Sequence, residues 1–495
     1  MKKFFISTSI PYANAQGHIG HALEFVQADV VARYHRAKGE NVFFLTGTDE
    51  HGIKIAKAAA DKGVNPQDFT DQISARFGEL IRVLSISNDD FIRTTDQKRH
   101  WPAVKEVWQK LGANGDLYKK QYEGLYCSGC EAFITEKELA DGRCAIHKKA
   151  PEKVAEENWF FKLSKYESQI KEKIEGGELR IVPEGRKNEV LSLINQGLQD
   201  VSFSRPKEKL QWGIPVPGDE TSVIYVWADA LVNYISALGY SGGEKFKKYW
   251  PADVHVVGKD ILRFHGTIWP AMLLSLGIAL PKTIFVHGYI TVDGQKISKS
   301  LGNVIDPFEL VQKYGADAVR YFLLREIPPT EDGDFSYEKF ETRYNADLAN
   351  NLGNQLKRVL DLAIKYGVSL EIPEKDAVLE CWRERRLFDA LENFEFSKAL
   401  ELLWRGIPVE EKGDEVRFVD SASVVGLSGL SSSIEANRPF DPMIDEAKRK
   451  QDTHNHLVEL WRIAVALELF LPETAERIQR QIQERKSEIL FPRIP

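Results

Sequence analysis

The chain has 495 residues, of which 43% are hydrophobic and 28% charged, and its formal net charge at pH 7 is −7. This length exceeds one simple hydrophobic core, so we expect two to four domains of ordinary globular composition. No apolar run is long enough to span a membrane, and the acidic balance excludes a protein coated with nucleic acid, although it permits a local basic surface that grips one folded RNA.

The cysteine content and the N-terminus indicate the compartment. Four cysteines in so long a chain cannot form a disulfide framework. The sequence enters a predicted strand directly after Met1–Phe4, without a small-residue cleavage site. We therefore expect a protein of the reducing cytoplasm.

The first predicted strand, Lys3–Ser7, leads through the loop Ser9–His21 into a helix over Ala22–Lys38. Gly39 follows the last periodic residue and is typical of a helix C-terminal cap. A strand, a tight loop and a helix in this order form the place where open α/β folds bind nucleotide phosphates.

Two histidines mark this loop. His18 and His21 are three residues apart in the first helical turn, so both point to the same face, and Gly20 lets a ligand approach the backbone. Two imidazoles over a helix N-terminus suit a polyphosphate whose charge grows in a transition state. The alternative is a pair of surface histidines at the start of a helix.

A second predicted strand, Asn41–Asp49, ends in a carboxylate. Because ligands gather at the carboxyl ends of such strands, Asp49 is a candidate partner for an amine or a hydroxyl. The alternative is that Asp49 only caps a helix that begins near Glu50. Amphipathic helices over Pro66–Leu84 and Lys98–Leu111 suggest the front half of a doubly wound sheet.

A cysteine-rich cluster follows. Cys127-x-x-Cys130 and Cys144-x-x-His147 have the spacing of tetrahedral zinc knuckles. Because they supply four ligands and leave no evident open position, we predict a structural zinc site, with isolated core thiols as the alternative. Cys381 lies far away in the sequence and is expected to pack inertly.

Residues 157–206 have a mixed composition that is typical of an insert. The sheet is predicted to resume at 221–227, followed by a helix over 228–238 and by buried strands at 254–258 and 283–287. The simplest topology is a nucleotide-binding fold that is split by an insertion containing the zinc module.

A lysine-containing loop comes after the last predicted strand. Asp293-Gly294 predicts a tight turn, and the following loop carries Lys296 and Lys299 between small hydroxyl residues. Mobile lysine charges on a flexible loop suit a departing pyrophosphate. On its own, such a pattern is usually a solvated basic loop.

The chain becomes helical beyond Asp317. Long helices are predicted over Tyr344–Tyr366 and Leu387–Trp404, so we expect an all-α C-terminal bundle. Residues 406–433 are rich in glycine, serine and acidic residues and are expected to form an inserted loop.

The predicted fold class is α/β, with a Rossmann-like doubly wound parallel sheet, split by a zinc-containing insert and followed by an all-α helical bundle. The predicted divisions are a catalytic domain over 1–117 and 222–290, a connective insert over 118–221, a lysine-loop and linking region over 291–345, and a helical domain over 346–495.

Several motifs together resemble those of class I aminoacyl-tRNA synthetases. H-I-G-H at 18–21 and K-I-S-K-S at 296–300 flank the split fold, and further segments are similar to the methionyl-tRNA synthetase family in detail. These segments are P-Y-A-N (11–14), T-G-T-D-E-H-G (46–52), Y-V-W-A-D-A (225–230), G-K-D-I-L-R-F-H (258–265), W-P-A-M (269–272) and V-H-G-Y-I-T-V-D-G-Q (286–295). The resemblance runs from residue 3 to about residue 366.

The resemblance implies a methionine–tRNA ligase that uses ATP with Mg²⁺. The methionine carboxylate would attack the α-phosphate of ATP, releasing pyrophosphate, and the adenylate would then esterify the terminal ribose of the tRNA. By resemblance, His18 and His21 stabilise the α-phosphoryl transition state, while Lys296 and Lys299 close over the departing pyrophosphate. The implied ATP contacts are Gly20, Gly258, Asp260 and Lys299.

The resemblance also assigns the amino-acid pocket. Asp49 would bind the substrate ammonium, and the aromatic residues with Ile261 would wrap the polarisable thioether, with His265 and Tyr12 near its sulfur. The implied pocket consists of Ile10, Tyr12, Asp49, Trp227, Ala230, Leu231, Tyr234, Ile261 and His265. The zinc set Cys127, Cys130, Cys144 and His147 resembles the single-knuckle form of the family, in the insert that guides the tRNA acceptor end.

By the same resemblance, the helical domain is expected to read the anticodon of tRNA(Met). Asn354 and Arg358 share a helix face and match family positions that contact anticodon bases. Where the family usually has a Pro-Trp pair, this chain has Pro442-Met443, although stacking on unpaired bases normally needs an aromatic residue. The sequence ends without an appended tRNA-binding dimerisation domain, so a monomer is expected.

Three other interpretations stay open at the level of sequence. A synthetase for another amino acid is one, because apolar side chains that differ by a methylene are separated by only ~1–3 kcal/mol. The absence of a large editing insert argues against the valine, leucine and isoleucine enzymes. A small-molecule nucleotidylyltransferase has no use for the zinc insert and the helical tail. A non-catalytic zinc RNA-binding protein is opposed by the intact histidine and lysine motifs.

Overall fold

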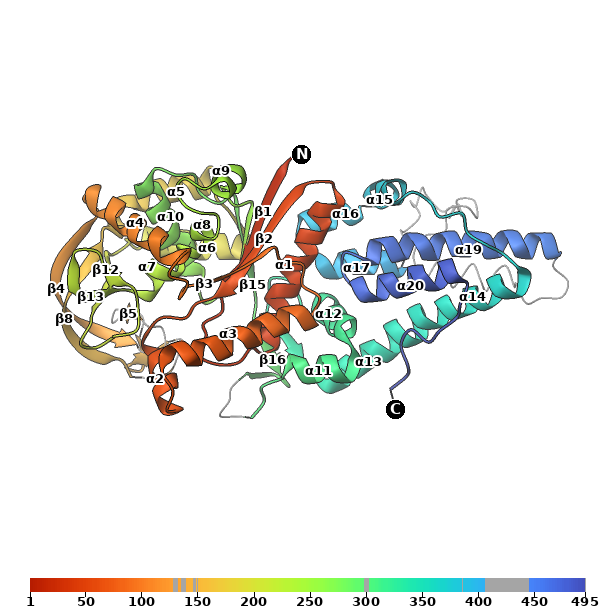
Figure 1. Cartoon of the computed structure of the whole chain (residues 1–495), viewed down its shortest axis with the longest axis horizontal. Helices are drawn as coiled ribbons and strands as arrows, with labels where there is room; N and C mark the ends of the chain where they lie inside the picture. Colours follow the sequence, from red (N-terminus) through yellow and green to blue (C-terminus); the bar gives the residue numbers. More distant parts are fainter. Residues whose placement is uncertain are drawn as a thin grey trace. The chain divides into compact units, whose positions relative to one another are not determined.

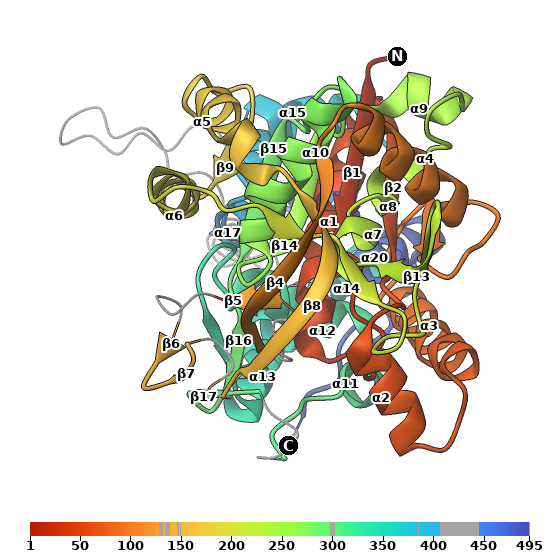
Figure 2. The same cartoon turned by 90° about the vertical axis from the view of Figure 1, so that its left-hand side faces the viewer.

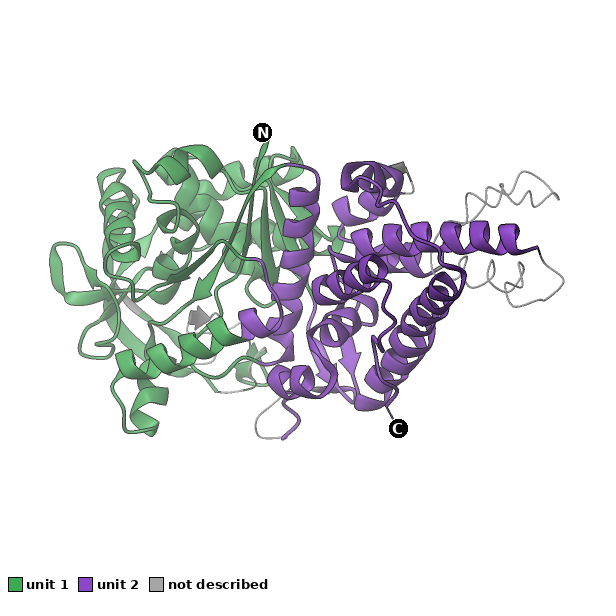
Figure 3. Cartoon of the chain, turned by 45° about the vertical axis from the view of Figure 1, so that its right-hand side comes forward, with its two compact units in different colours: residues 1–17, 40–79, 88–287 green, residues 18–39, 80–87, 288–495 purple. Residues whose placement is uncertain are grey.

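The computed structural model describes residues 1–127, 132–134, 139–145, 148, 150–297, 302–384, 386–405 and 445–494. It divides into two compact units, shown in different colours in Figure 3. Unit 1 consists of residues 1–17, 40–79 and 88–287, and unit 2 consists of residues 18–39, 80–87 and 288–495.

Unit 1 is built on a six-stranded parallel sheet, most of whose strands are labelled in Figure 2. Along the sheet the strands are β3 (Asp90–Arg93), β2 (Asn41–Thr48), β1 (Lys3–Thr8), β14 (Val254–Gly258), β15 (Thr283–His287) and β9 (Arg180–Val182). Ile6 pairs with Val254 on one side of β1, and Phe5 pairs with Phe43 on the other. Short, nearly continuous apolar runs form these strands because both faces of a parallel sheet are covered.

The strand order places a topological switch at β1. From β1 the chain proceeds to β2 and β3 on one side, whereas β14 and β15 lie on the other side. In open α/β sheets, ligands bind outside the carboxyl ends of the strands at such a point. The residues that follow Thr8, Thr48 and Gly258 therefore stand at the place where a ligand is expected.

Helices and turns surround this sheet in unit 1. The core combines Phe5, Leu45 and Val257 from the strands with Trp108 and Leu273 from the helices. The helical elements are α2 (Ile53–Asp61), α4 (His100–Ala113), a 3₁₀ helix (Leu163–Tyr166), α5 (Glu167–Glu175), α6 (Glu184–Asn195), α7 (Val226–Ala230), α8 (Asn233–Ser236), α9 (Glu244–Tyr249), a π-helical turn (Phe264–Ile268) and α10 (Trp269–Leu276). Helix α3 (Pro66–Val83) begins in unit 1 and ends in unit 2.

Antiparallel strands form the rest of unit 1. The long antiparallel pair of β4 (Leu117–Cys127) and β8 (Glu152–Phe161), prominent in Figure 2, is flanked by β10 (Val201–Ser202) and β5 (Ala132–Ile134). A second sheet contains β11 (Ser204–Pro206), β13 (Asp219–Ile224) and β12 (Pro215–Val216), and a two-stranded ribbon contains β6 (Leu139–Ala140) and β7 (Arg143–Cys144).

Two predicted features of the sheet are wrong. The run 221–227 does not resume the parallel sheet, because β13 pairs antiparallel with β11 and β12 and helix α7 begins at Val226. The strand that rejoins the sheet is β9. It lies inside the predicted insert 118–221 and pairs with β15. A short apolar strand does not reveal its partner, since pairing is decided by distant residues.

Two predicted helices are interrupted. The helix expected over 228–238 is divided into α7 and α8. The helix expected over Leu387–Trp404 is divided into α16 (Leu387–Glu392) and α17 (Phe396–Arg405). Between them, Phe394 has a φ of +60°, a left-handed conformation that no helix continues through.

Unit 2 is mainly helical, with α14, α19 and α20 packed side by side (Figure 1). The predicted helix 344–366 is confirmed as a π-helical segment (Tyr344–Gly353) that continues into α14 (Asn354–Tyr366). The other helices are α1 (Ile19–Ala37), α11 (Pro307–Tyr314), α12 (Ala316–Arg325), α13 (Tyr337–Arg343), α15 (Lys375–Glu384), α16, α17, α19 (Glu446–Leu467) and α20 (Pro472–Glu484). None of the helices in the described part of the chain is long and apolar enough to cross a membrane.

A small sheet in unit 2 carries the predicted tight turn. Strand β16 (Ile290–Val292) pairs antiparallel with β17 (Gln295–Lys296) and parallel with β18 (Gly333–Phe335). Asp293 and Gly294 both have positive φ, +50° and +73°, as the two-residue hairpin turn requires. The turn is therefore confirmed.

Candidate active site

The loop after β1 and the end of β2 are joined at the switch point of unit 1. Tyr12 and Asp49 form an isolated parallel bridge. The amide of Asp49 donates to the carbonyl of Pro11 at 2.9 Å, and the amide of Ala13 donates to the carbonyl of Asp49 at 2.8 Å. Asp49 is 7% exposed. The two predicted pocket residues Tyr12 and Asp49 are thus brought together.

The predicted apolar pocket residues gather in the same core cluster of unit 1. Leu231 and Tyr234 are buried in this cluster, while Ile10, Tyr12, Trp227 and Ile261 are partly buried and pack against it. The indole of Trp227 stacks on the ring of Phe264, with the ring centroids 3.8 Å apart and the planes inclined by 14°. Ala230 is buried at the end of α7. An apolar, aromatic site of this kind suits a polarisable thioether.

His265 is a neutral residue that is hydrogen-bonded within the protein. Its Nδ1 donates to the carbonyl of Ile261 at 3.0 Å, so Nε2 accepts the hydroxyl proton of Tyr234 at 2.7 Å. Burial lowers the pKa of His265 to about 4. His265 therefore accepts from the Tyr234 hydroxyl, and its single N–H donates to the carbonyl of Ile261.

The end of β14 supplies the two residues predicted to contact ATP in unit 1. Gly258 closes the strand and is buried, whereas Asp260 is exposed. A Cβ on Gly258 would lie 2.9 Å from Oδ1 of Asp260, so the glycine leaves room for this carboxylate. The amide of Ile261 donates to the carbonyl of Gly258 at 3.2 Å and tightens the turn.

A buried carboxylate in α7, Asp229, joins two histidines. Oδ2 of Asp229 lies 2.7 Å from Nδ1 of His51, and Oδ1 lies 2.7 Å from Nε2 of His100. Burial opposes ionisation of Asp229, but its interactions with both histidines hold the pKa of this carboxyl below its ordinary value. Because Asp229 lies in α7 between Trp227 and Ala230, the network anchors the helix that carries these pocket residues.

The predicted histidine pair begins helix α1 in unit 2. The helix starts at Ile19 rather than at Ala22, with His18 as its N-cap and His21 at the third helical position. The amide of Gly20 donates to Nδ1 of His18, and the amide of His18 donates to Nδ1 of His21, each at 3.1 Å. The two rings lie against each other with centroids 4.0 Å apart.

This capping arrangement sets the tautomer of both imidazoles. Since each Nδ1 accepts a backbone proton, each neutral ring carries its own proton on Nε2. Two Nε2–H donors at the positive end of a helix can bind phosphate oxygens. A Cβ on Gly20 would lie only 2.9 Å from Cε1 of His18, so only glycine leaves this ring in place.

Other predicted site residues are described in part. The backbone of Lys296 pairs with Thr291 in the β16–β17 hairpin. Asn354 and Arg358 lie one turn apart on α14, the first exposed and the second half-buried. Lys299, Met443 and the segment 406–433 lie outside the described residues.

Two of the four predicted zinc ligands are described, and they lie together. Cys127 ends β4 and Cys144 ends β7, and both are buried in one small cluster with Leu125 and Leu139 packed against it. Cys130 and His147 lie outside the described residues. Within the described ranges, no group of three histidine, cysteine or acidic side chains could hold a metal.

Sequence reasoning did not single out several residues that shape this site. Phe264 stacks on Trp227. Its position directly before His265 in the motif G-K-D-I-L-R-F-H could have indicated a role in the pocket. The pairing of Asp229 with His51 and His100 had no signal, because the partners are 178 and 129 positions away in the sequence.

Most of the sequence matches a known family model. Residues 4–140 and 134–360 match the family described as tRNA synthetases class I (M). The match covers strands β1, β2 and β14, the histidine pair, and the pocket residues in α7 and in the segment after β14. These features together define a class I aminoacyl-tRNA synthetase.

Individual relatives are more specific. The chain is 46% identical to the methionine–tRNA ligase of Thermotoga maritima, over 97% of this chain and 75% of that protein. It is 41% identical to the enzyme of the same name from Caldanaerobacter subterraneus subsp. tengcongensis, over 100% of this chain and 79% of that protein. The structure of Mycobacterium tuberculosis methionyl-tRNA synthetase in complex with methionyl-adenylate superposes with a TM-score of 0.87, at 35% identity and full coverage of both chains.

The chain belongs to the methionyl-tRNA synthetase family. Its activity is that of a methionine–tRNA ligase, an enzyme that joins methionine to tRNA.

Proposed function

We propose that the pocket at the carboxyl ends of β1, β2 and β14 binds methionine, and that His18 and His21 bind the phosphates of ATP during formation of methionyl-adenylate. The methionine carboxylate attacks the α-phosphate and pyrophosphate leaves; a hydroxyl of the terminal ribose of tRNA(Met) then attacks the carbonyl of the adenylate, which forms the ester and releases AMP. No covalent enzyme intermediate is required, so the protein contributes positioning and charge stabilisation.

The capping arrangement of the two histidines is the observation that carries this proposal. Backbone amides donate to both Nδ1 atoms, so each neutral ring carries its proton on Nε2, the position from which it can donate to a phosphate oxygen. As negative charge develops on the α-phosphoryl oxygens, two such donors at a helix N-terminus stabilise it. Mg²⁺ bound with ATP neutralises further phosphate charge when present.

Within the methionine pocket, each residue type has a chemical task. Asp49 binds the substrate ammonium through its carboxylate. Ile10, Tyr12, Trp227 and Ile261 cover the thioether from the partly buried rim, while Ala230, Leu231 and Tyr234 form its base. His265, neutral and bonded to Tyr234, keeps the Tyr234 hydroxyl aligned at this base.

ATP contacts are proposed at two turns that contain a glycine. Gly20 lets the phosphates approach the start of α1, and Gly258 with Asp260 contacts the ribose and base region. Lys296 and Lys299 close over the departing pyrophosphate, a task that suits flexible point charges.

A structural zinc ion is proposed for the tip of the β4–β8 insert. The burial of Cys127 and Cys144 in one cluster supports this, because a zinc knuckle requires thiols from separate strands to converge. Cys130 and His147 would complete the set of four ligands. The metal would hold the tip of the insert that guides the tRNA acceptor end.

The helical part of unit 2 is proposed to read the anticodon through Asn354 and Arg358, which lie on one face of α14. The proposed enzyme works as a monomer in the cytoplasm.

The substitution Gly20→Ala tests the histidine assignment. The new Cβ displaces the His18 ring, so we expect the rate of methionine-dependent ATP–pyrophosphate exchange to fall on the order of 100-fold, with the KM for methionine unchanged. Gly78→Ala is the matched control, because Gly78 lies within α3 with no atom within 4 Å of an added Cβ. An exchange rate that Gly20→Ala leaves at the wild-type level would contradict the assignment.

A further inference from the structure

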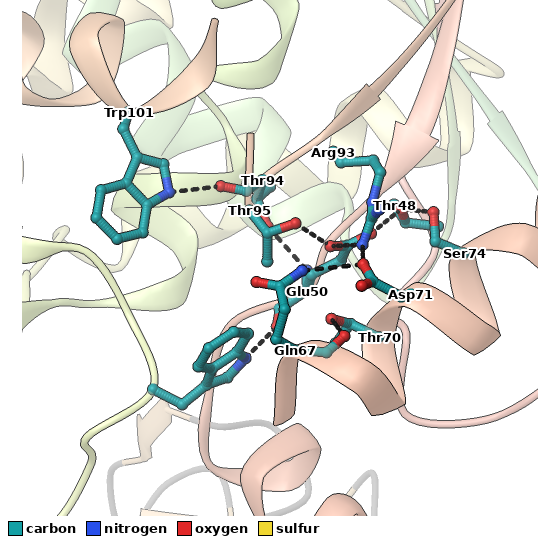
Figure 4. A network of polar contacts seen from close by, with 11 residues as sticks. Thr48, Glu50, Gln67, Thr70, Asp71, Ser74, Arg93, Thr94, Thr95 and Trp101 are labelled. Carbon is teal, nitrogen blue, oxygen red and sulfur yellow. Dashed lines mark hydrogen bonds and ion pairs between the residues drawn. The ribbon is translucent and has the colours of Figure 1, made fainter. Parts of the chain in front are cut away.

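Glu50, the residue after Asp49, is a fully buried carboxylate at the end of β2. It is 0% exposed and is the centre of the network in Figure 4. Its Oε1 accepts from Nε of Arg93 at 2.7 Å and from the Thr48 hydroxyl at 2.6 Å. Its Oε2 accepts from Nη2 of Arg93 at 2.9 Å and from the Thr95 hydroxyl. The guanidinium and the carboxylate thus form a bidentate pair that two hydroxyl groups complete.

The backbone of Glu50 is held as firmly as its side chain. Its amide donates to the Thr94 hydroxyl at 2.8 Å, and its carbonyl accepts from Nε1 of Trp212 at 2.5 Å. The peptide groups of Asp49 are bonded to the loop after β1, as described above. Hydrogen bonds therefore restrain the main chain on both sides of the Asp49 Cα, and this fixes the position from which the Asp49 side chain extends.

This arrangement excludes Glu50 as a substrate ligand. Each of its carboxylate oxygens already accepts two hydrogen bonds, and no part of the residue reaches solvent. A buried ion pair adds little net stability, because desolvation of the charges offsets their attraction. A bidentate pair does restrict orientation, and here it restricts the residue adjacent to the proposed ammonium ligand.

We propose that the Glu50–Arg93 pair is a positioning device that holds the Asp49 carboxylate in the geometry that binds the ammonium group of methionine. The inference rests on the proposed role of Asp49. In this proposal, Glu50 and Arg93 support the selectivity for the amino group indirectly, through Asp49, while the aromatic residues select the thioether.

Asp71 provides a built-in contrast on the same arginine. Nη2 of Arg93 also bonds to Asp71, whose side chain is 48% exposed, whereas the Glu50 side chain is 0% exposed. An ion pair this exposed contributes little, because water screens it. If Arg93 acts through Glu50, then loss of Asp71 leaves the Asp49 geometry intact.

The experiment compares two inhibitors that differ only in the amino group, methioninol and 4-(methylthio)butan-1-ol. Their inhibition constants are measured in ATP–pyrophosphate exchange with wild-type and Glu50→Gln protein. The glutamine amide places N–H donors against the Arg93 donors, so the pair is disrupted without loss of volume. We expect methioninol binding to weaken about tenfold and the KM for methionine to rise equally, with 4-(methylthio)butan-1-ol and the KM for ATP unchanged.

Two further variants keep this test decisive. Arg93→Lys retains the charge but loses the planar fork, so it should reproduce the selective loss even if Glu50→Gln protein fails to fold. Asp71→Asn should leave both inhibition constants at their wild-type values. Equal weakening of the two inhibitors by Glu50→Gln or Arg93→Lys, or a selective loss in Asp71→Asn, would overturn the inference.

Asp49→Asn, measured in parallel, separates this inference from the proposal beneath it. If Asp49→Asn leaves the preference for methioninol over 4-(methylthio)butan-1-ol intact, the ammonium role of Asp49 is refuted. If Asp49→Asn removes this preference while Glu50→Gln and Arg93→Lys retain it, only the positioning role is refuted.

Discussion

Each unit of the molecule contains an arginine paired with a fully buried carboxylate, and the two pairs have different surroundings. In unit 1, Glu50 is 0% exposed but Arg93 is 31% exposed, and the pair adjoins the proposed substrate ligand Asp49. In unit 2, Asp29 and Arg320 are both 0% exposed and lie 2.7 Å apart between helices α1 and α12. The first pair is proposed to position the Asp49 carboxylate, whereas the second pair links two packed helices.

The unit 2 network joins groups from several elements. Oδ1 of Asp29 accepts from the amide and hydroxyl of Ser87, and Oδ2 pairs with Arg33 as well as Arg320. Arg320 also donates to the carbonyls of Leu84 and Phe470. Burial opposes ionisation of Asp29, but both arginines hold the pKa of its carboxyl below its ordinary value. The pair thus joins α1 and α12 to the segment just before α20.

The largest expected effect is on stability and comes from Arg320→Met. This change leaves the buried carboxylate of Asp29 without its fully buried partner, which destabilises a protein by about 3–5 kcal/mol. Urea unfolding followed by circular dichroism measures the loss, and the KM for methionine of the folded protein should stay at the wild-type value. Adding Asp29→Asn to Arg320→Met should restore part of the stability. An unchanged urea midpoint would show that the Asp29–Arg320 pair does not stabilise the fold, contrary to the role given to it here.

A pH effect of intermediate size is expected from Asp317, which lies one helical turn before Arg320 on α12. Its Oδ2 accepts from the amide of Thr474, and burial raises the pKa of Asp317 to about 6 from an ordinary value of 3.8. The stability contributed by this raised pKa is fully present below about pH 4 and is lost as the pH rises through about 6, a change of about 3 kcal/mol in total.

The variant Asp317→Asn isolates this titration. Because its amide oxygen can still accept from Thr474 and cannot ionise, the variant should gain thermal stability over the wild type at pH 8 and lose that advantage at pH 4. Thermal midpoints of both proteins at the two pH values provide the measurement. A difference between the proteins that is the same at both pH values would show that Asp317 does not titrate in this range.

The smallest effect is expected from Arg33→Gln. Arg33 pairs with the same Asp29 at 2.7 Å, but its side chain is 22% exposed and Asp29 keeps its bonds to Arg320 and Ser87. We expect a loss of about 1 kcal/mol in the free energy of unfolding, measured in the same urea titration. A loss as large as that of Arg320→Met would mean that burial does not rank the two arginines.

Local sequence patterns were sufficient for much of the fold. Continuous apolar runs predicted strands β1, β14 and β15, since parallel strands are covered on both faces. The turn at Asp293-Gly294 and the C-terminal cap of α1 at Gly39 were predicted because both positions require positive φ. The family and its ligase activity were predicted from short motifs that can be recognised in the sequence without knowledge of the fold.

Residue contacts between distant segments were decided only by the tertiary structure. The three residues of β9 are too few to show a period, so nothing local placed them beside β15. The start of α1 moved to Ile19 because the His18 and His21 rings cap the helix, a task usually performed by serine, threonine or aspartate.

The motif T-G-T-D-E-H-G shows both limits at once. It identified Asp49 as a candidate ligand, because a carboxylate at the end of a parallel strand is recognisable from local sequence. The partners of its two neighbours, Arg93 for Glu50 and Asp229 for His51, lie 43 and 178 positions away. Folding alone brings these groups together, because a buried carboxylate or imidazole is stable only beside a partner that the rest of the chain supplies.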